Sequence, residues 1–565
     1  MAYFKRDRFS GIAPGVSPRL LADQFGQTAE NVDLESGRLI SIKEDSDTYA
    51  LQNSIRRSIY YYRDTNWLEW SEDDVSVVPG PIPGDTTDRL YFTGDDYPRV
   101  GTYTSLVEGS VGYPVNSYRL GVKAPTSAPT TTKSGTADDT QTPSDVSYVY
   151  TFVSAMGEEG PPSPPSTVFE LTDTETVEVT MGSTLSGTYN FGAGALRRIY
   201  RSNTGSTNTT FQYVGFTDYT DQTFTDTVNA ANLGEVLPSG TWIEPPNDNG
   251  TVYPDGPLQQ LIPLAQGVMA GFTGKRFCLS EPFLPHAWPI AYRITTEEDI
   301  VAIASTANGV AALTDGQPYF ITGTDPSAMT AIRIDLAQAC VNKHSVVDMG
   351  DYVLYAGPDG LCAVQSASGS VVTNGLISVE QWNSDFNPTT IRAFKHEGTY
   401  VAFYSGGGWV YDPRGEESAL TTLSLSSDVR GGYTNPKDGE LYIIVGNKIK
   451  KYRGGSTSKT ATFKSKKFVT PSPVSMSWVS VHANEYPVTV KVWGDGTLVA
   501  HYTLSKSGST YTQATTVPSS ISNGTLREPV MRMPAVVAQE WEVQVEGTDI
   551  NEFCLAQSME EIRGT

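Results

Sequence analysis

The sequence predicts an all-β protein built around a β-propeller of about six or seven blades, with two β-sandwiches attached. The composition supports this class, because 52 Gly, 35 Pro and 30 Tyr supply turns and β-favouring side chains. Between residues 265 and 455, a Gly or Asp turn is repeatedly followed by an aromatic residue and a β run. These aromatic residues are Phe277, Tyr319, Tyr352, Tyr400 and Tyr442, whose numbers differ by 33 to 48, close to one blade. An irregular series of β-sandwiches with coincidental spacing is the alternative.

Two-residue turn signals inside this region favour hairpins within the blades. They are Asn308-Gly309, Asp359-Gly360, Asp438-Gly439 and Gly446-Asn447. Five repeats leave a ring short of closure, so residues 55–120 are expected to supply one or two more blades. Strands are expected there at 58–62, 67–70 and 89–92, separated by Pro-Gly turns.

The N-terminal segment contains the best helix signal, over residues 17–31. Ser17 can cap a helix, Pro18 fits its first position, and Leu21 and Phe25 recur at helical spacing. After it, residues 33–40 predict a turn at Gly37 leading into a strand.

A polar stretch and a compact β unit precede the main blades. Residues 124–146 are rich in Thr, Ser, Pro and Asp, which predicts an extended linker. Residues 147–238 then contain short strands over about 90 residues, the size of a fibronectin-type-III-like sandwich.

The C-terminal part has a different hydrophobic pattern, because apolar and polar side chains alternate in residues 487–493 and 541–546. Such alternation predicts strands with one buried face, and Asp495-Gly496 predicts the turn between two of them. The expected organisation has four parts. They are an N-terminal helix and docking segment with the first propeller strands (1–123), a linker with the fibronectin-like insert (124–240), the main blades (241–458) and a C-terminal β-sandwich (459–565).

Charge and targeting signals narrow the class of protein. The formal net charge is −23, which argues against binding nucleic acid by neutralising phosphates over the whole surface. The charge serves either solubility alone or a surface that repels DNA and lets it slide past. The N-terminus does not read as a signal peptide, and no apolar run is long enough for a membrane helix. The four cysteines, which are Cys278, Cys340, Cys362 and Cys554, lie in strand-like runs and are expected to be buried free thiols.

The sequence offers no constellation typical of catalysis, and we expect no enzyme activity, metal or cofactor. The five histidines are scattered without metal-ligand spacing. Residues 271–275 resemble part of a phosphate loop, but the Gly spacing is too short and Arg276 stands where Ser or Thr is required. A carboxylate pair of a propeller glycosidase cannot be located from sequence, so that activity stays open.

Two groups of side chains are candidates for a contact surface. Trp67 and Trp70 lie in a charged segment, whereas the other strand tryptophans are expected in the core. Basic residues cluster between residues 448 and 467, including Lys464, Lys466 and Lys467. This cluster is either a solvated linker or a docking surface for an acidic neighbour.

Three segments resemble tail nozzle proteins of short-tailed bacteriophages, also called tail tubular protein B. The first runs from Gly11-Ile12-Ala13-Pro14 through Ser17-Pro18-Arg19-Leu20-Leu21-Ala22-Asp23-Gln24 to Ala29-Glu30-Asn31-Val32-Asp33-Leu34-Glu35-Ser36-Gly37. The second, residues 148–165 with 198–202 and 224–227, looks like the fibronectin-like insert of phage virion proteins. The third comprises residues 463–468 and 486–490 with Asp495-Gly496 and residues 556–558.

The resemblance implies a structural virion protein in a ring, with six copies expected, lining the DNA-ejection channel of the tail. Such a ring would dock to an adaptor or tail-tube protein and carry a tail fibre or receptor-binding protein. It would assemble in the host cytoplasm. The residues expected in subunit docking are Pro18, Arg19, Leu20, Asp23, Gln24 and Asn31. A host-surface glycan-binding adhesin or tail-fibre-type lectin is the alternative, followed by the propeller glycosidase.

Overall fold

The all-β prediction is confirmed by a computed structural model, which describes residues 3–109, 112–185, 187–204, 208–414 and 419–563. Strands dominate these residues, and the α-helices are short: α1 (Tyr103–Val107), α2 (Val379–Asp385) and α3 (Met559–Arg563). No helix of the described ranges has the length and apolarity needed to cross a membrane. The chain divides into two compact units, one of residues 1–57 with 335–565 and one of residues 58–334.

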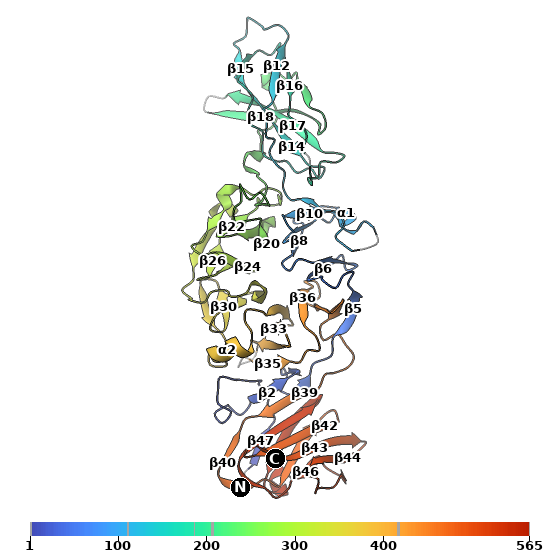
Figure 1. Ribbon diagram of the computed structural model, residues 1–565. Helices are drawn as coiled ribbons and strands as arrows, with labels where there is room; N and C mark the ends of the chain where they lie inside the picture. The colour runs from blue at the N-terminus through green and yellow to red at the C-terminus, as the bar shows by residue number, and fades with distance from the viewer. Residues whose placement is uncertain (1–2, 110–111, 186, 205–207, 415–418, 564–565) are drawn as a thin grey trace. The chain divides into compact units, whose positions relative to one another are not determined.

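The unit of residues 58–334 contains three four-stranded antiparallel sheets of the kind that forms propeller blades (Figure 1). The first sheet contains β8 (Ser76–Pro79), β9 (Leu90–Thr93), β10 (Arg99–Gly101) and β11 (Tyr118–Arg119). The second contains β20 (Gln259–Pro263), β21 (Met269–Thr273), β22 (Arg276–Leu279) and β23 (Ile294–Thr295). The third contains β24 (Ile300–Thr306), β25 (Gly309–Thr314), β26 (Tyr319–Thr322) and β27 (Thr330–Arg333). The first strands β8, β20 and β24 lie next to one another. A hairpin of β6 (Ser58–Tyr62) and β7 (Asn66–Trp70) belongs to the same unit.

An insert between β11 and β20 forms a separate β-sandwich. One sheet contains β12 (Thr130–Ser134), β16 (Thr176–Thr180) and β19 (Thr223–Asp226); another contains β14 (Tyr148–Val153), β17 (Leu196–Thr204) and β18 (Thr209–Asp218); and β13 (Ser144–Val146) pairs with β15 (Phe169–Leu171). Side chains such as Tyr150, Ile199 and Val179 from the two larger sheets share one core. The predicted linker over 124–146 is therefore wrong, because β12 and β13 pair within the sandwich.

The unit of residues 1–57 and 335–565 contains three further groups of four strands with the blade pattern. They are β28 (Val347–Asp348), β29 (Val353–Ala356), β30 (Leu361–Gln365) and β31 (Ser368–Val371); β32 (Arg392–His396), β33 (Thr399–Tyr404), β34 (Gly407–Asp412) and β35 (Ala419–Leu423); and β36 (Val429–Thr434), β37 (Leu441–Val445), β38 (Lys448–Lys451) and β5 (Ser46–Ala50). Two are separate sheets, whereas the group β32–β35 continues through the pairing of β35 with β2 (Gly26–Glu30) into a twelve-stranded sheet. Strand β32 lies against β28 and β36. The N-terminal strand β5 thus completes a sheet whose other strands lie about 400 residues later.

The same unit ends in a sandwich that combines strands from both termini (Figure 1). One sheet contains β1 (Tyr3–Arg6), β3 (Val32–Asp33), β4 (Leu39–Ser41), β41 (Trp478–Ala483), β46 (Val530–Arg532) and β48 (Asp549–Ala556). The other is the remainder of the twelve-stranded sheet that begins with β32–β35. It contains β2, β39 (Ala461–Ser465), β40 (Phe468–Ser475), β42 (Val488–Gly494), β43 (Thr497–Ser507), β44 (Thr510–Val517), β45 (Gly524–Leu526) and β47 (Val537–Gly547). We call this element the terminal sandwich.

The predicted helix over 17–31 does not form. Residues 17–25 make turns, in which the backbone of Leu20 and Leu21 bonds to the carbonyl of Ser17, and strand β2 follows. Strand β2 pairs with β39, so its backbone groups bond across the sheet instead of along a helix. At Gly26 a Cβ would lie 2.7 Å from the Lys464 carbonyl oxygen, which explains why this strand begins with glycine.

The predicted hairpin turns are confirmed, but the aromatic repeat is not in phase with the blades. Asn308-Gly309 joins β24 to β25, and Asp495-Gly496 joins β42 to β43. Phe277 and Tyr319 lie on the third strands of their sheets, whereas Tyr400 and Tyr442 lie on second strands. The recurring turn followed by an aromatic residue therefore indicates where a strand begins. It does not indicate equivalent positions in successive blades.

Candidate docking surface and ligand pocket

The predicted docking residues and the predicted contact lysines meet on one side of the terminal sandwich. The backbone N–H of Lys467 donates to the Pro18 carbonyl at 2.9 Å. Nζ of Lys466 lies 3.1 Å from the Asp23 carboxylate, which also pairs with Arg6 at 3.1 Å. This surface, which we define as residues 17–24 with 466–469 and Glu540, is called the docking surface below.

Glu540 on β47 connects the two halves of the docking surface. Its carboxylate pairs with Arg19, and its other oxygen lies 3.4 Å from Nζ of Lys467. Val469 faces Glu540 in the strand register and is 44% exposed. The sequence contained no signal for Glu540. The alternation along 541–546 predicts a strand, but it does not show which residues from other segments that strand contacts.

Leu20 is the most exposed large hydrophobic side chain of the described residues, at 78%. It lies at the tip of the turn that Ser17 starts, whereas Leu21 and Phe25 are buried in a small cluster with Ala13. The turn is therefore anchored by its apolar neighbours and by the Arg19 and Asp23 ion pairs while Leu20 projects into solvent.

Two other predicted docking residues point inward or bond within the chain. Asn31 is 5% exposed, has a φ of 56°, and its side-chain amide donates to Ser424 Oγ at 2.7 Å and accepts from the Ser424 N–H at 3.1 Å. The Gln24 carbonyl accepts from the Ser10 N–H at 3.0 Å. The expectation that Asn31 contacts a neighbouring subunit is wrong, because it joins β2 to the segment after β35.

The predicted contact surface at Trp67 and Trp70 is also wrong. Their exposed fractions are 4% and 3%. Trp67 stacks on Tyr61 with ring centroids 4.5 Å apart, and Trp70 packs against Phe92. The sequence could not show whether these tryptophans are buried or exposed. A strand pattern indicates which residues share a face, but it does not show whether both faces are covered by other side chains.

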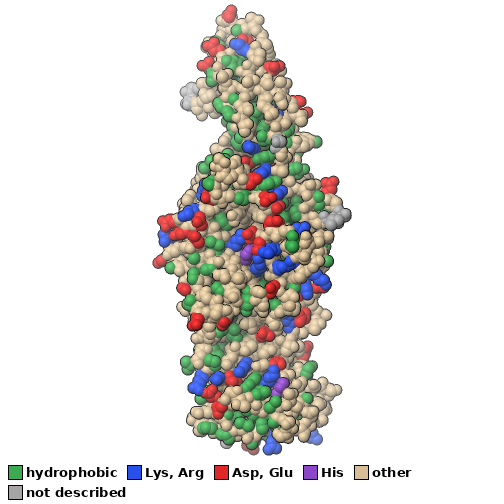
Figure 2. Space-filling view, viewed as in Figure 1, with side chains coloured by type: hydrophobic (Ala, Val, Ile, Leu, Met, Phe, Trp, Pro, Cys, Tyr) green, Lys and Arg blue, Asp and Glu red, His purple; other side chains and the backbone are tan. Residues whose placement is uncertain are grey.

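The basic run is neutralised within the chain. Lys464 lies 3.4 Å from Glu542 and 4.6 Å from the centroid of the Trp493 ring. The other pairs are Lys448 and Lys450 with Asp47, Lys451 with Glu440, and Arg453 with Asp33. Figure 2 shows blue and red side chains next to one another over the terminal sandwich at the bottom of the view. A free cationic surface for an acidic neighbour is therefore not present among these residues.

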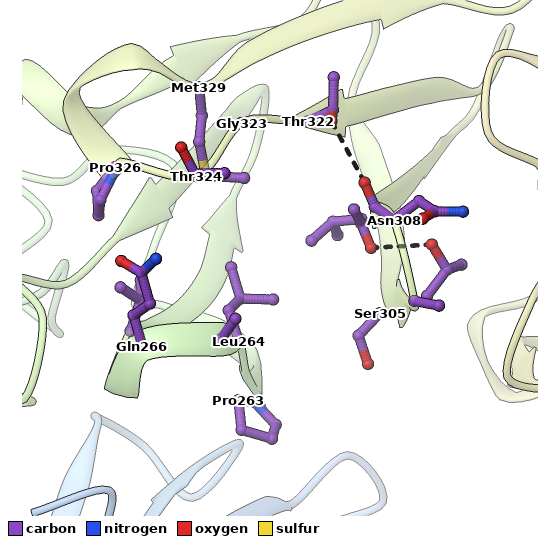
Figure 3. A pocket seen from close by; sticks show the side chains of 16 residues that line it. Pro263, Leu264, Gln266, Ser305, Asn308, Thr322, Gly323, Thr324, Pro326 and Met329 are labelled. Carbon is purple, nitrogen blue, oxygen red and sulfur yellow. Dashed lines mark hydrogen bonds between the residues drawn. The ribbon is translucent and has the colours of Figure 1, made fainter.

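A pocket of about 570 Å³ opens between the sheet of β20–β23 and the sheet of β24–β27 (Figure 3). Its wall is made by the turn η3 (Ala265–Gly267), the β24–β25 hairpin and the segment between β26 and β27. No residue that lines it is charged or aromatic. The only sequence signal near it was the Asn308-Gly309 turn.

Burial shifts the pKa values of several titratable groups in the core. Burial raises the pKa of the Cys278 and Cys554 thiols to about 11 and of Cys340 and Cys362 to about 12, so all four remain protonated near neutral pH. The prediction of buried free thiols is confirmed. Burial also lowers the pKa of His286. Within the described residues, no group of three His, Cys, Asp or Glu side chains is placed to hold a metal ion.

Comparisons with known proteins give no family. No family model matches the chain, and no curated protein does. A solved structure of BBS1N in complex with ARL6DN aligns with a TM-score of 0.31 and 11% identity over 74% of this chain and 100% of that one. The extracellular domain of the putative one-component system BT4673 from B. thetaiotaomicron aligns with a TM-score of 0.21 and 9% identity over 88% of this chain and 47% of that one. Scores this low carry no argument about function.

Proposed function

We propose that this chain is a structural subunit of the distal tail tube, or nozzle, of a short-tailed bacteriophage. Copies of the chain form a ring that lines the DNA-ejection channel and docks to an adaptor or tail-tube protein and to a fibre or receptor-binding protein. The sequence resemblance of residues 11–37, 148–165 and 463–468 to nozzle proteins motivates the proposal. The protein has no catalytic role in this account.

The observation that carries the proposal is the anchoring of the N-terminal nozzle-like segment on the terminal sandwich. Strand β2 is paired with β39, and the turn before it is held by Asp23–Lys466 and Arg19–Glu540 contacts. These contacts fix a rigid turn from which Leu20 projects. A ring of identical subunits requires such a preformed surface, because each subunit presents one surface to a different surface of the next.

The charge of the chain fits passage of DNA without binding. At a net charge of −23 per subunit, a ring accumulates negative charge that repels phosphates. The basic side chains between residues 448 and 467 do not offset this repulsion of DNA phosphates, because carboxylates of the same chain neutralise most of them.

Light scattering and electron microscopy of the purified protein test the proposal. The wild-type protein is expected to form ring-shaped particles of several subunits. The variant Leu20→Asp is expected to yield monomers with unchanged thermal unfolding, because a charge at an exposed interface position opposes association without touching the core. Val168→Asp, at a 66% exposed position of the insert, is the matched control and should still form rings. A wild-type protein that stays monomeric, with no ring in micrographs, contradicts the proposal.

A further inference from the structure

The pocket between the sheets of β20–β23 and β24–β27 is preformed by its turns. Thr306 Oγ1 donates to the Gly309 carbonyl at 3.1 Å within the β24–β25 hairpin, and Thr322 Oγ1 on β26 donates to the Asn308 carbonyl at 3.3 Å, which ties the hairpin to the next strand. On the opposite wall, Asp325 caps the turn η5 (Pro326–Ala328) by accepting from the Ser327 N–H at 2.8 Å. The cavity therefore needs little reorganisation to accept a ligand.

Backbone conformation fixes the shape of the remaining wall. Gln266 has a φ of 60°, which turns the chain sharply between β20 and β21. Gly323 has a φ of 149°, and a Cβ there would lie 2.8 Å from Cα of Met329. The left-handed backbone at Gln266 and the close approach of Gly323 to Met329 thus set the positions of two lining residues, Gln266 and Met329.

The lining combines an apolar floor with uncharged polar groups. Leu264 and Gln266 extend from one turn toward the segment that carries Thr324 and Met329 (Figure 3). Gln266 is exposed and its amide can donate and accept, as can the hydroxyl of Thr324. The volume is within the range of roughly 300–1,000 Å³ that small-molecule sites occupy.

We propose that this pocket binds a neutral saccharide. A pyranose ring has an apolar C–H face, which suits Leu264 and Met329, and a rim of hydroxyls, which suits an amide and a threonine hydroxyl. A phosphorylated, sialylated or sulfated ligand would find no counter-charge, because no residue that lines the pocket is Lys, Arg or His. A nucleobase would find no aromatic ring to stack on. The inference does not depend on the ring proposed above.

The full-length protein is tested on an array of immobilised neutral glycans together with their sialylated and sulfated forms. At least one neutral glycan should be retained, and its charged form should bind at least about tenfold more weakly. Saturation-transfer NMR with the retained glycan in solution then measures binding by the variants.

Two pocket variants and one control make the test specific. Ala265→Trp should abolish binding, because Ala265 lines the pocket at an exposed position and the indole would fill it. Gln266→Gly removes the amide while keeping the left-handed backbone, and should weaken binding by about tenfold, as loss of one hydrogen bond does. Asn387→Gly, at another left-handed position (φ 49°) distant in sequence, should leave binding unchanged.

Three results would overturn the proposal: retention of no neutral glycan, equal binding of charged and neutral forms, or binding that survives Ala265→Trp. Preferential retention of an uncharged peptide control on the same array would overturn it as well. Circular dichroism of each variant separates loss of binding from loss of folding.

Discussion

The Asp23 carboxylate lies 3.1 Å from Nζ of Lys466, which joins two residues 443 positions apart in the chain. This contact fixes the N-terminal turn on the C-terminal strands. Asp23 is 68% exposed on its side chain, and Lys466 is 16% exposed, so solvent screens the pair only in part.

We expect a coupling free energy of about 0.2–1 kcal/mol between Asp23 and Lys466. A double-mutant cycle of Asp23→Ala and Lys466→Ala, followed by urea unfolding, measures it. The coupling should fall at high salt, because exposed charges are screened. A coupling that does not change with salt would show that the pair acts through packing.

Replacing Asn31 should separate its backbone role from its hydrogen bonds. Asn31→Ala should cost about 3 kcal/mol, because it loses two hydrogen bonds to Ser424 and forces an L side chain without a polar group into the left-handed region. Asn31→Gly should cost about 2 kcal/mol, since glycine adopts this φ freely. Equal costs for the two variants, measured by urea unfolding, would contradict this division.

The insert contains a buried ion pair whose loss should be severe. Arg201 and Asp226 are 4% and 0% exposed, their atoms lie 2.8 Å apart, and Tyr148 donates to the same carboxylate oxygen at 2.7 Å. Asp226→Asn should destabilise the insert by about 3–5 kcal/mol, because it leaves the guanidinium buried without a counter-charge. The exposed Asp139→Asn is the control and should be neutral in the same unfolding experiment.

Stability should fall in mild acid through His286. This side chain is 3% exposed, and burial lowers its pKa below the ordinary 6.5, with Arg89 acting in the same direction and Glu158 and Glu159 opposing. The unfolded chain therefore binds the proton more readily, so the stabilisation is present above pH 6.5 and is lost as the pH falls through the folded-state pKa.

Thermal unfolding between pH 5 and 7 measures this effect. The wild-type protein should lose stability relative to His286→Gln as the pH falls, since glutamine does not titrate. His482→Gln, at a position whose side chain is 48% exposed, should follow the wild type. A constant difference between wild type and His286→Gln across this range would sink the prediction.

The thiols should react only after unfolding. All four cysteines are buried, and their raised pKa values keep them protonated. Ellman's reagent should therefore react slowly with the native protein and label four thiols per chain in denaturant. Fast reaction of one thiol in the native protein would reveal local opening around it.

Short-range patterns determined much of the secondary structure. Asn308-Gly309 and Asp495-Gly496 turn the chain where expected, because such pairs tolerate the backbone angles of tight hairpins. The strand expected over 58–62 is present as β6, and the alternation over 487–493 corresponds to β42. These features depend on neighbouring residues, so the sequence alone defines them.

Contacts between distant residues decided the rest. The local pattern of residues 26–30 favours a helix, but these residues form a strand because their backbone groups hydrogen-bond to β39. Trp70 was buried against Phe92 of another sheet, and Lys464, Lys466 and Lys467 were neutralised, by partners that no local pattern identifies. The uncharged pocket likewise exists only because three turns from residues 263–268, 305–310 and 322–329 meet at one place. The sequence alone therefore determined the β character and the turns of this protein. Only the tertiary structure decided which side chains face solvent, because burial depends on pairing between segments far apart in the chain.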